Sequence, residues 1–567
     1  MPIKVLDPKV VSRIAAGEVV ERPASVVKEL VENSLDAGSS QVSIEVEGGG
    51  ISLIRVIDDG SGILPAELGL AFERYATSKI DNLSDLESIS SLGLRGEALP
   101  SIAAVAEVGI TTCAKGEQAG SYLTLKDGVT IKKGSYGRPQ GTTVTVRNLF
   151  RKLPARLKFL KSPVTENSHI ASTVSQYALA FPEVKFNLVI DARLSLRTPG
   201  SGKLLDSIAQ VYGLEIAQNM LEVKGLGEGS ESLGPQVTGM VGTPEVSRSS
   251  RSYLSFFVNR RPVNSRLLIW AVEEAYHGLL MTGKHPVAII NLALSPSRVD
   301  VNVHPTKLEV KFQNERLVFG TVQKAVRQTL ISGMPVSKVG EVKAKFVTMP
   351  QPRQIVWTET GTIERRRLSG RVSPTPKISL PVLRILGQFE GAYIVAEGPD
   401  GLYLIDQHAA HERILFEKIK QQRSQQKMEV QGLLEPVTFE VSPQQAETLK
   451  LYANHLAEFG FAIEPFGDRT YLVRNVPALV DQKDWAMVLR ELLDSLAEES
   501  SLDLGEKIAI SLACHGAVRA GQGLTDDEMR QLLRTLEQVT IPNTCPHGRP
   551  TMIYLSTRQL KKEFGRV

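Results

Sequence analysis

The chain has 567 residues, of which 42% are apolar and 23% are charged, a balance typical of soluble globular proteins. A single hydrophobic core rarely extends beyond ~300 residues, so several domains are expected. The chain begins without the apolar stretch of a signal peptide, and no apolar run approaches the length of a membrane span. Three widely spaced cysteines favour a reducing compartment over a disulfide framework. We therefore expect a cytoplasmic protein without a membrane partner.

The first part of the chain contains a helical pattern that carries polar side chains on one face. Within Val26–Asn33 the apolar residues have helical spacing, and Glu29 and Asn33 lie four residues apart, so both project from the same face. The carboxylate could activate water, and the amide oxygen could bind Mg²⁺. The alternative is the ordinary polar surface of a helix, which this segment alone favours.

A strand predicted at Ile51–Ile57 ends in the residues Asp58-Asp59-Gly60-Ser61-Gly62. A carboxylate at the end of a strand can accept a hydrogen bond from the amino group of adenine, and glycines let a base approach the backbone. The alternative is a hairpin turn, because Asp-Gly is a common turn pair.

A loop rich in backbone donors follows. Gly93 and Gly96 flank Arg95, and a helix is predicted to begin near Glu97. Backbone N–H groups at the start of a helix bind phosphate. The segment Gly141–Val146 is predicted as a strand whose hydroxyls are available to a bound base. These motifs predict a nucleotide site although the chain contains no P-loop sequence.

Positive charge is concentrated in one segment, which separates the first part of the chain from the last. The formal charge of +4 is small for this length, but residues 336–381 hold nine Lys and Arg against three acids, a net +6 that leaves −2 elsewhere. Five prolines and few aromatic residues in this segment predict a flexible basic linker.

The last part of the chain gathers side chains that can bind a metal. A short apolar run up to Ile405 precedes five of them within twelve residues: Asp406, His408, His411, Glu412 and Glu417. On a helix, His408 and Glu412 would share a face. Cys514–His515 and the turn Cys545-Pro546-His547 add further ligands. A divalent metal is predicted; acids placed for the helix dipole and cysteines that fill the core are the alternatives.

Five motifs in order, ELVEN, DDGSG, TSK, GLRGEAL and GTTV, resemble the GHKL ATPase family, which includes type II topoisomerases and histidine kinases. Within that family, Ile14–Gly38 resembles the MutL proteins of DNA mismatch repair, and the resemblance extends over nearly the whole chain. Leu94 departs from the Phe that is usual in the lid motif, which predicts altered packing only.

The resemblance implies an α/β and α+β multidomain fold. The expected parts are a GHKL (Bergerat-type) α/β sandwich at residues 1–215, a transducer domain like ribosomal protein S5 at 216–335, the linker at 336–381, and a C-terminal α+β dimerisation and endonuclease domain at 382–567. A regulatory subdomain is expected as an insertion at residues 433–504.

For ATP hydrolysis the resemblance implies Glu29 as general base and Asn33 as the Mg²⁺ ligand. The residues implied around adenine are Asp58, Gly60, Gly62 and Thr143. The residues implied in the lid and phosphate region are Thr77, Ser78, Lys79, Gly93, Arg95, Gly96 and Glu97. Lys307, in a predicted strand pair at Val299–Phe312, resembles the lysine that reaches the γ-phosphate from the second lobe.

Three arginines of the second lobe, Arg260, Arg261 and Arg266, are interpreted as DNA contacts, with a solvated surface as the alternative. Such a patch would bind double-stranded DNA through its phosphates without sequence preference.

In the last domain the resemblance is to the endonuclease motif of MutL proteins that nick DNA themselves. It implies that Zn²⁺ or Mn²⁺ is held by Asp406, His408, Glu412, Cys545 and His547, with Asp406 and Glu412 catalytic and Glu417 and Cys514 as accessory residues. The role of His515 stays open, because a basic residue is usual there.

The segment Gln431-Gly-Leu-Leu434-Glu-Pro436 resembles a motif that binds the replication sliding clamp, with an ordinary strand entry as the alternative. The function implied is a homodimeric ATP-driven clamp that works at the nucleoid during repair, coupling mismatch recognition by a MutS-type protein to nicking of DNA. Two alternatives remain open: another GHKL enzyme, such as a topoisomerase subunit, and a non-nucleolytic scaffold with a structural zinc.

Overall fold

The computed structural model describes residues 20–78, 92–93, 96–223, 234–280, 283–300, 310–333, 383–480, 484–497, 503–517 and 523–564. The predicted linker lies outside the described residues, as do Lys79, Arg95 and Lys307. The chain forms two compact units, residues 1–333 with 419–516, and residues 334–418 with 517–567.

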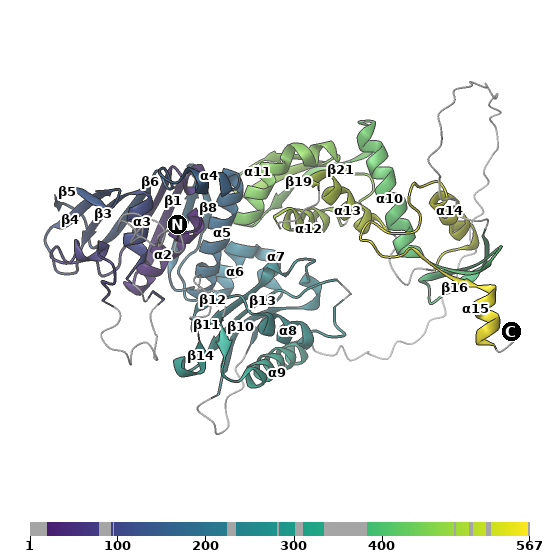
Figure 1. Cartoon of the computed structure of the whole chain (residues 1–567), viewed down its shortest axis with the longest axis horizontal. Coiled ribbons are helices and arrows are strands. Elements are labelled where there is room, and N and C mark those ends of the chain that lie inside the picture. Colours follow the sequence, from purple (N-terminus) through teal and green to yellow (C-terminus); the bar gives the residue numbers. More distant parts are fainter. Residues whose placement is uncertain are drawn as a thin grey trace, which may run out of the picture. The chain divides into compact units, whose positions relative to one another are not determined.

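The first unit begins with an eight-stranded sheet in the order β5-β4-β3-β6-β2-β1-β7-β8 (Figure 1). Its strands are β1 (Gln41–Glu47), β2 (Leu53–Asp58), β3 (Glu107–Cys113), β4 (Gly120–Lys126), β5 (Val129–Tyr136), β6 (Gly141–Arg147), β7 (Lys185–Ile190) and β8 (Arg193–Arg197). Buried residues alternate with more exposed ones along β1, β2 and β6, because one face of the sheet carries the core. At the edge, β5 leaves Val129, Ile131 and Tyr136 more than half exposed.

Helices cover the buried face of this sheet. The helices of this lobe are α2 (Pro23–Asp36), α3 (Ala98–Val105), α4 (Pro154–Phe159), α5 (Pro163–Ala180), α6 (Leu204–Tyr212) and α7 (Leu214–Gln218). A proline at the first turn of α2 suits a helix start, and Val26, Val27, Leu30 and Val31 are all buried in the core. The helix predicted at Val26–Asn33 is therefore confirmed, and so is the helix predicted to begin near Glu97.

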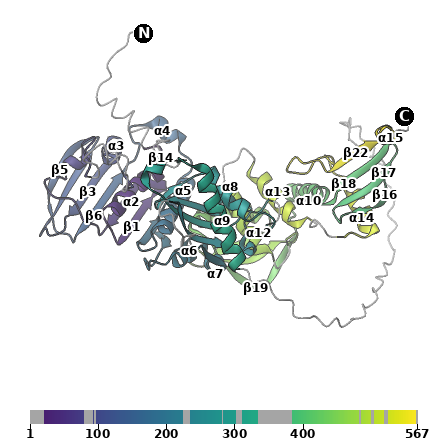
Figure 2. The same cartoon turned by 90° about the horizontal axis from the view of Figure 1, so that it is seen from below.

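A second sheet has five strands in the order β12-β11-β13-β10-β9. Its strands are β9 (Met220–Val223), β10 (Gln236–Gly242), β11 (Leu254–Val258), β12 (Arg261–Val263) and β13 (Ala288–Ala293). Helices α8 (Arg266–Ala275) and α9 (Glu315–Gly333) pack together against it (Figure 2). The strand pair expected at Val299–Phe312 is seen at its ends, where β14 (Val299–Asp300) pairs with β15 (Lys311–Phe312). Tyr253 and Phe257 join the core of the first sheet, so the two lobes share one apolar core.

Residues 419–516 belong to this same unit. They form a small sheet ordered β19-β21-β20, with strands β19 (Val430–Glu440), β20 (Ala462–Pro465) and β21 (Thr470–Pro477). The helices are α11 (Pro443–Glu458), α12 (Trp485–Ala497) and α13 (Leu504–Gly516). Helix α11 packs along α5 of the ATPase lobe. The insertion expected at residues 433–504 of the C-terminal domain stays a prediction.

A buried polar contact fixes α11 and α12 to Tyr253, the residue just before β11 of the second sheet. Tyr253 Oη donates to Asp494 Oδ1 over 3.2 Å, and Gln445 Nε2 donates to the same oxygen over 2.8 Å. Asp494 Oδ2 has no hydrogen-bond partner among the described residues. Close by, Glu491 forms ion pairs with Lys284 and with His515 Nε2, the latter at 2.9 Å. His515 thus serves this contact within the unit.

The buried carboxylate of Asp494 should make the stability of the folded protein depend on pH. Burial raises its pKa from 3.8 to about 6, against the opposing effects of Gln445, Tyr253 and Arg248, while Glu491 adds to the rise. A raised folded-state pKa stabilises the fold below the unfolded-state pKa, and this stability is lost as the pH rises through the folded-state pKa. The loss is on the order of 3 kcal/mol by pH 8, since each pKa unit corresponds to about 1.4 kcal/mol.

The isosteric Asp494→Asn should therefore raise the unfolding temperature at pH 8, because it keeps the acceptor oxygen and removes the buried charge. The advantage should shrink toward pH 5 when both proteins are compared by calorimetry. An Asn variant that is less stable at pH 8, or equally affected at every pH, would contradict this expectation.

The second unit contains a four-stranded antiparallel sheet ordered β16-β17-β18-β22. Its strands are β16 (Arg384–Phe389), β17 (Tyr393–Gly398), β18 (Gly401–Asp406) and β22 (Met552–Ser556). The helices that begin in this unit are α10 (Gln407–Ser424), α14 (Asp526–Leu536) and α15 (Thr557–Glu563). Ile394, Ala396 and Ile405 pack against α14 on one face of the sheet.

The opposite face of this sheet is apolar but more open. Strand registry places Val395, Leu404 and Ile553 in one row, and Leu402 beside Leu555 in the next. None of these five residues is buried, and Ile553 is 57% exposed. Such a surface is typical of an interface rather than of a solvated sheet. Along the described residues, no helix combines the length and the apolar character that a bilayer span requires.

Candidate functional site

A buried carboxylate marks the predicted nucleotide site. Asp58 is the last residue of β2 and is only 8% exposed. Its Oδ1 accepts hydrogen bonds from the backbone N–H groups of Gly60 and Thr142, at 3.0 and 3.1 Å, and Ser34 Oγ donates to Oδ2 over 2.9 Å. Burial raises the pKa of Asp58, and these hydrogen bonds oppose the rise. The carboxylate is therefore fixed in one orientation at the end of the central strand β2.

The glycines after Asp58 do not form a hairpin. Strand β2 pairs with β1 and β6, not with the next strand in sequence, so the turn interpretation is wrong. Gly62 has φ +71°, and a Cβ there would collide with the Cys113 carbonyl, while a Cβ on Gly60 would lie 2.7 Å from Ser39 Oγ. The backbone is therefore packed too tightly for side chains beside the carboxylate.

Helix α2 presents the predicted catalytic pair. Glu29 and Asn33 are both half-buried, with 17% of the Glu29 side chain exposed, and Lys28 Nζ lies 3.4 Å from Glu29 Oε1. The neighbouring acid Glu32 is buried and accepts a 2.5 Å hydrogen bond from Tyr177 Oη. Of these two acids, Glu29 is therefore the one placed to meet a water molecule.

The lid region is held at its start by the end of α2. Asp36 Oδ1 accepts the Leu92 N–H over 2.9 Å, and Oδ2 accepts the Gly93 N–H over 3.0 Å. Gly96 has φ +58° and packs against the Ala76 carbonyl, where a Cβ would collide. Glu97 directly precedes α3, and Thr77 and Ser78 are exposed.

Several residues of this site were missed by the sequence interpretation. Ser34 and the Thr142 N–H orient Asp58, whereas the expected Thr143 accepts a hydrogen bond from Arg138 over 3.1 Å. Asp36 lies one turn beyond Asn33, so the helical spacing that marked Glu29 and Asn33 could have found it.

The three arginines of the second lobe have different surroundings. Arg266 is exposed at the start of α8. Arg260 is partly exposed and packs over Phe181, with its guanidinium carbon 4.1 Å from the ring centre. Arg261 is only 7% exposed, so the expectation of an exposed side chain is wrong for this residue. The hairpin turn between β11 and β12 points its side chain into the protein.

The second unit brings three predicted metal ligands together. One ligand atom each of Glu412, Cys545 and His547 lies within 4.8 Å of the others. His547 Nδ1 is 3.3 Å from Glu412 Oε2, and His408 Nε2 is 3.3 Å from Glu412 Oε1, so Glu412 lies between the two imidazoles. Glu412 and Cys545 are buried, at 5% and 1% exposure. A buried carboxylate and thiol beside two more exposed imidazoles form a set that suits a divalent metal.

Arg413 fastens the cysteine segment to α10. The side chain is 7% exposed, Nε donates to the Thr544 carbonyl over 2.5 Å, and Nη1 lies 3.4 Å from Glu417 Oε1. Gly548, with φ +82°, completes the turn by donating its N–H to the Cys545 carbonyl over 2.9 Å. Arg413 was missed because a lone arginine within a helix carries no sequence signal of its own.

Two other predicted ligands, Asp406 and Glu417, are held by neighbouring groups. Asp406 Oδ1 accepts the backbone N–H groups of His408 and Ala409, at 2.9 and 3.0 Å, so the carboxylate caps α10 and does not belong to the group around Cys545. Glu417 is held by Arg413. Cys514 belongs to α13 of the first unit.

The expected clamp-binding segment protrudes from β19. The pairing of β19 with β21 is interrupted between Gly432 and Val437, and Leu434 is 100% exposed. Gln431 Nε2 donates to the Val480 carbonyl over 2.5 Å. The segment is therefore an exposed irregularity within β19, and its clamp-binding role stays a prediction.

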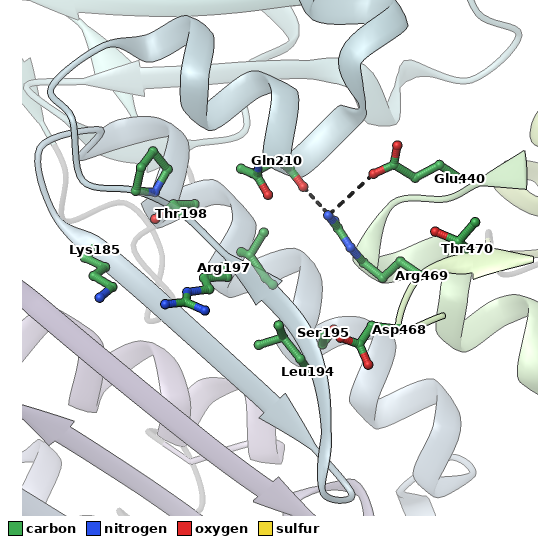
Figure 3. Close-up of a pocket in the computed structure, with 12 residues that line it drawn as sticks. Lys185, Leu194, Ser195, Arg197, Thr198, Gln210, Glu440, Asp468, Arg469 and Thr470 are labelled. Atoms are coloured by element: carbon green, nitrogen blue, oxygen red, sulfur yellow. Dashed lines mark hydrogen bonds and ion pairs between the residues drawn. The ribbon is translucent and has the colours of Figure 1, made fainter. Parts of the chain in front are cut away.

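A cavity of about 690 Å³ is lined by residues of neither predicted site (Figure 3). Lys185 and Arg197 lie on one side, and Glu440 and Asp468 on the other, with Arg469 Nη1 donating to the Gln210 carbonyl over 2.6 Å. Charges of both signs in the lining point to no single class of ligand.

Comparison with known families agrees with this geometry. Residues 21–146 match the family described as histidine kinase-, DNA gyrase B-, and HSP90-like ATPase. Residues 208–331 match the C-terminal domain of DNA mismatch repair protein, and residues 386–524 match the MutL C terminal dimerisation domain.

Whole-length relatives decide the family. The DNA mismatch repair protein MutL of Desulforudis audaxviator is 43% identical, over 100% of this chain and 99% of that protein. The MutL of Methanothrix thermoacetophila is 40% identical over the same shares. The chain belongs to the MutL family of DNA mismatch repair proteins. This excludes the topoisomerase alternative.

Solved structures of single domains are also similar. The ATPase domain of Aquifex aeolicus MutL complexed with ADP is 28% identical, covers 54% of this chain and 98% of that chain, and has a TM-score of 0.36. The N terminal domain of a DNA repair protein is 27% identical, covers 57% and 98%, and has a TM-score of 0.49. As a MutL family member with a matching GHKL domain, the chain is an ATPase that carries a C-terminal dimerisation domain.

Proposed function

We propose that this chain is an ATP-switched homodimeric clamp that links mismatch recognition by a MutS-type protein to nicking of DNA by its own metal-dependent site. The observation that supports nicking most strongly is the group of Glu412, Cys545 and His547 beside His408, in which the carboxylate and the thiol are buried and the His547 imidazole reaches solvent. The clamp would act at the nucleoid of the cytoplasm.

In the ATPase site the proposed roles follow from position. Asp58 accepts a hydrogen bond from the adenine amino group, because its other contacts fix the carboxylate. Asn33 offers its amide oxygen to Mg²⁺, and Glu29 accepts a proton from the attacking water. Gly93 and Gly96 keep the lid backbone free of side chains near the phosphates. Thr77, Ser78, Lys79, Arg95, Glu97 and Lys307 remain proposed phosphate-side contacts.

At the proposed nuclease site, Cys545, His547, Glu412 and His408 would hold the metal, with Asp406 nearby in sequence. The few cysteines and the buried carboxylate fit a catalytic site better than a closed structural zinc, which tends to be rich in cysteine. Bound Zn²⁺ or Mn²⁺ would supply an activated water and charge neutralisation at the phosphate. Arg413 and Glu417 keep the cysteine segment against α10, and Cys514 stays a proposed accessory residue.

DNA contact is proposed for Arg266 and Arg260, whose side chains reach solvent. Binding would be to phosphates and would weaken as salt rises. Dimerisation is proposed to use the apolar face of Val395, Leu404, Ile553, Leu402 and Leu555, because a second copy of this chain would cover it and because residues 386–524 match a dimerisation domain.

The exposed segment of β19 around Leu434 is the proposed contact for the sliding clamp. Burying a leucine contributes about 1.5–3 kcal/mol, so Leu434→Ala should weaken clamp binding by roughly 10- to 100-fold in calorimetry. Val437→Ala, a change to a 41% exposed neighbour outside the motif, is the matched control. Equal affinities of the two variants would remove this contact from the proposal.

Relaxation of supercoiled plasmid by the purified chain tests the nuclease directly. Nicking is expected with Mn²⁺ and should stop with a chelator. A chain that holds zinc but leaves plasmid intact under every metal condition would support the alternative, a non-nucleolytic scaffold.

A further inference from the structure

Arg261 is a buried cation that reaches from one lobe into the other. Residues Asn259 and Arg260 have φ +49° and +67°, as in a two-residue hairpin turn of type I′, and this turn makes Arg261 the first residue of β12. The guanidinium Nη2 donates to the Leu92 carbonyl over 2.6 Å. A residue of the transducer sheet is thus bonded directly to the start of the ATPase lid motif.

The same short backbone segment is held from its other side by the catalytic helix. Asp36 accepts the N–H groups of both Leu92 and Gly93, and it is the last residue of α2, which carries Glu29 and Asn33. An acid at the C-terminal end of a helix is opposed by the helix dipole, so these two donors offset an unfavourable position. The segment therefore joins α2 to β12.

The positive charge of Arg261 also has acidic side chains within electrostatic reach. A buried guanidinium is costly unless opposite charge or hydrogen bonds surround it. Burial raises the pKa of Tyr177 well above its usual value, the charges of Glu32 and Glu29 raise it further, and the charge of Arg261 lowers it. Arg261 thus lies within electrostatic reach of the acids of α2.

We propose that Arg261 is a positioning residue for ATP hydrolysis, which couples the transducer sheet to the lid through the Leu92 carbonyl. A shift of the β11–β12 hairpin would then move Leu92 and Gly93 and, through their hydrogen bonds to Asp36, also the helix that bears Glu29. This role replaces the DNA contact expected for Arg261 and is independent of the nuclease site.

The test is steady-state ATPase kinetics of the full-length chain with Arg261→Lys, Asp36→Asn and the double variant. Lysine keeps the charge but loses the planar fork of donors, and asparagine keeps one acceptor oxygen. Each single variant should lower kcat/KM for ATP about tenfold, and the double variant should be little worse than either, because both residues hold one segment. DNA affinity and its salt dependence should not change.

Arg251→Lys is the matched control, since Arg251 forms an exposed two-point ion pair with Glu273 on the same lobe, at 2.8 and 3.1 Å. It should leave both kinetic constants within about twofold. Wild-type kinetics in Arg261→Lys, or effects of Arg261 and Asp36 that multiply in the double variant, would overturn the coupling. A loss of kcat in proportion to the unfolded fraction, with KM unchanged, would reduce Arg261 to a structural role. Weakened DNA binding by Arg261→Lys at normal ATPase activity would instead restore the DNA contact.

Discussion

Glu29→Gln should lower ATP turnover by about 100-fold or more while ATP binding changes by less than about threefold. The reason is the position of Glu29 on α2, one helical turn before Asn33 and still 17% exposed, where it can take a proton from water. Glutamine keeps the size of the side chain and cannot accept that proton. Turnover is measured as phosphate release, and binding by titration with ATP.

Glu45→Gln provides the control, because Glu45 forms an ion pair with Arg55 on the same sheet, at 2.7 Å and partly exposed. Its ATPase activity should match that of the unmodified chain. If Glu29→Gln hydrolyses ATP at the normal rate, the base lies elsewhere. Glu32 would not be the next candidate, because Tyr177 already occupies its Oε1.

Glu412→Gln is expected to reduce metal-dependent plasmid nicking by at least about 100-fold and to leave the ATPase unchanged. Glu412 lies between His408 and His547, so the loss of its charge removes the carboxylate that both imidazoles approach and that is proposed to hold the metal. Asp406→Asn should preserve the fold, because asparagine also caps helices well, so a loss of nicking in this variant would report the proposed catalytic role of the Asp406 carboxylate.

The control for this pair is Glu537→Gln, an exposed acid at the end of α14 in the same unit. It should nick plasmid normally. Normal nicking by Glu412→Gln would show that the group around Glu412 and Cys545 is not the nuclease site. Lost nicking together with lost ATPase would indicate a general folding defect.

Much of the fold could be predicted from local sequence. The apolar spacing around Glu29 predicts α2, and the run that ends at Asp58 predicts β2, because both patterns follow from burial of one face. Burial of an individual side chain could not be predicted. Arg260 and Arg261 are adjacent and alike in sequence, and a two-residue turn directs one outward and the other into the core.

The candidate sites show the same limit. His408 and Glu412 could be paired from helical spacing, but their approach to Cys545 depends on Arg413 and on a turn far along the chain. The attachment of residues 419–516 to the first unit could not be predicted either, because it depends on contacts between residues such as Tyr253 and Asp494 that are distant in sequence. The proposed ligand roles themselves stay predictions.

The edge strand β5 of the eight-stranded sheet affects how readily the protein aggregates. Val129 and Ile131 are exposed on β5, which is the outermost strand of this sheet among the described residues, and Lys132 and Lys133 follow in the same strand. The positive charges of these lysines repel those of a second molecule and so oppose pairing between two β5 strands, and salt screens that repulsion. Concentrated solutions of the protein should therefore aggregate more readily at high salt. The two lysines protect the exposed edge strand against aggregation at low salt.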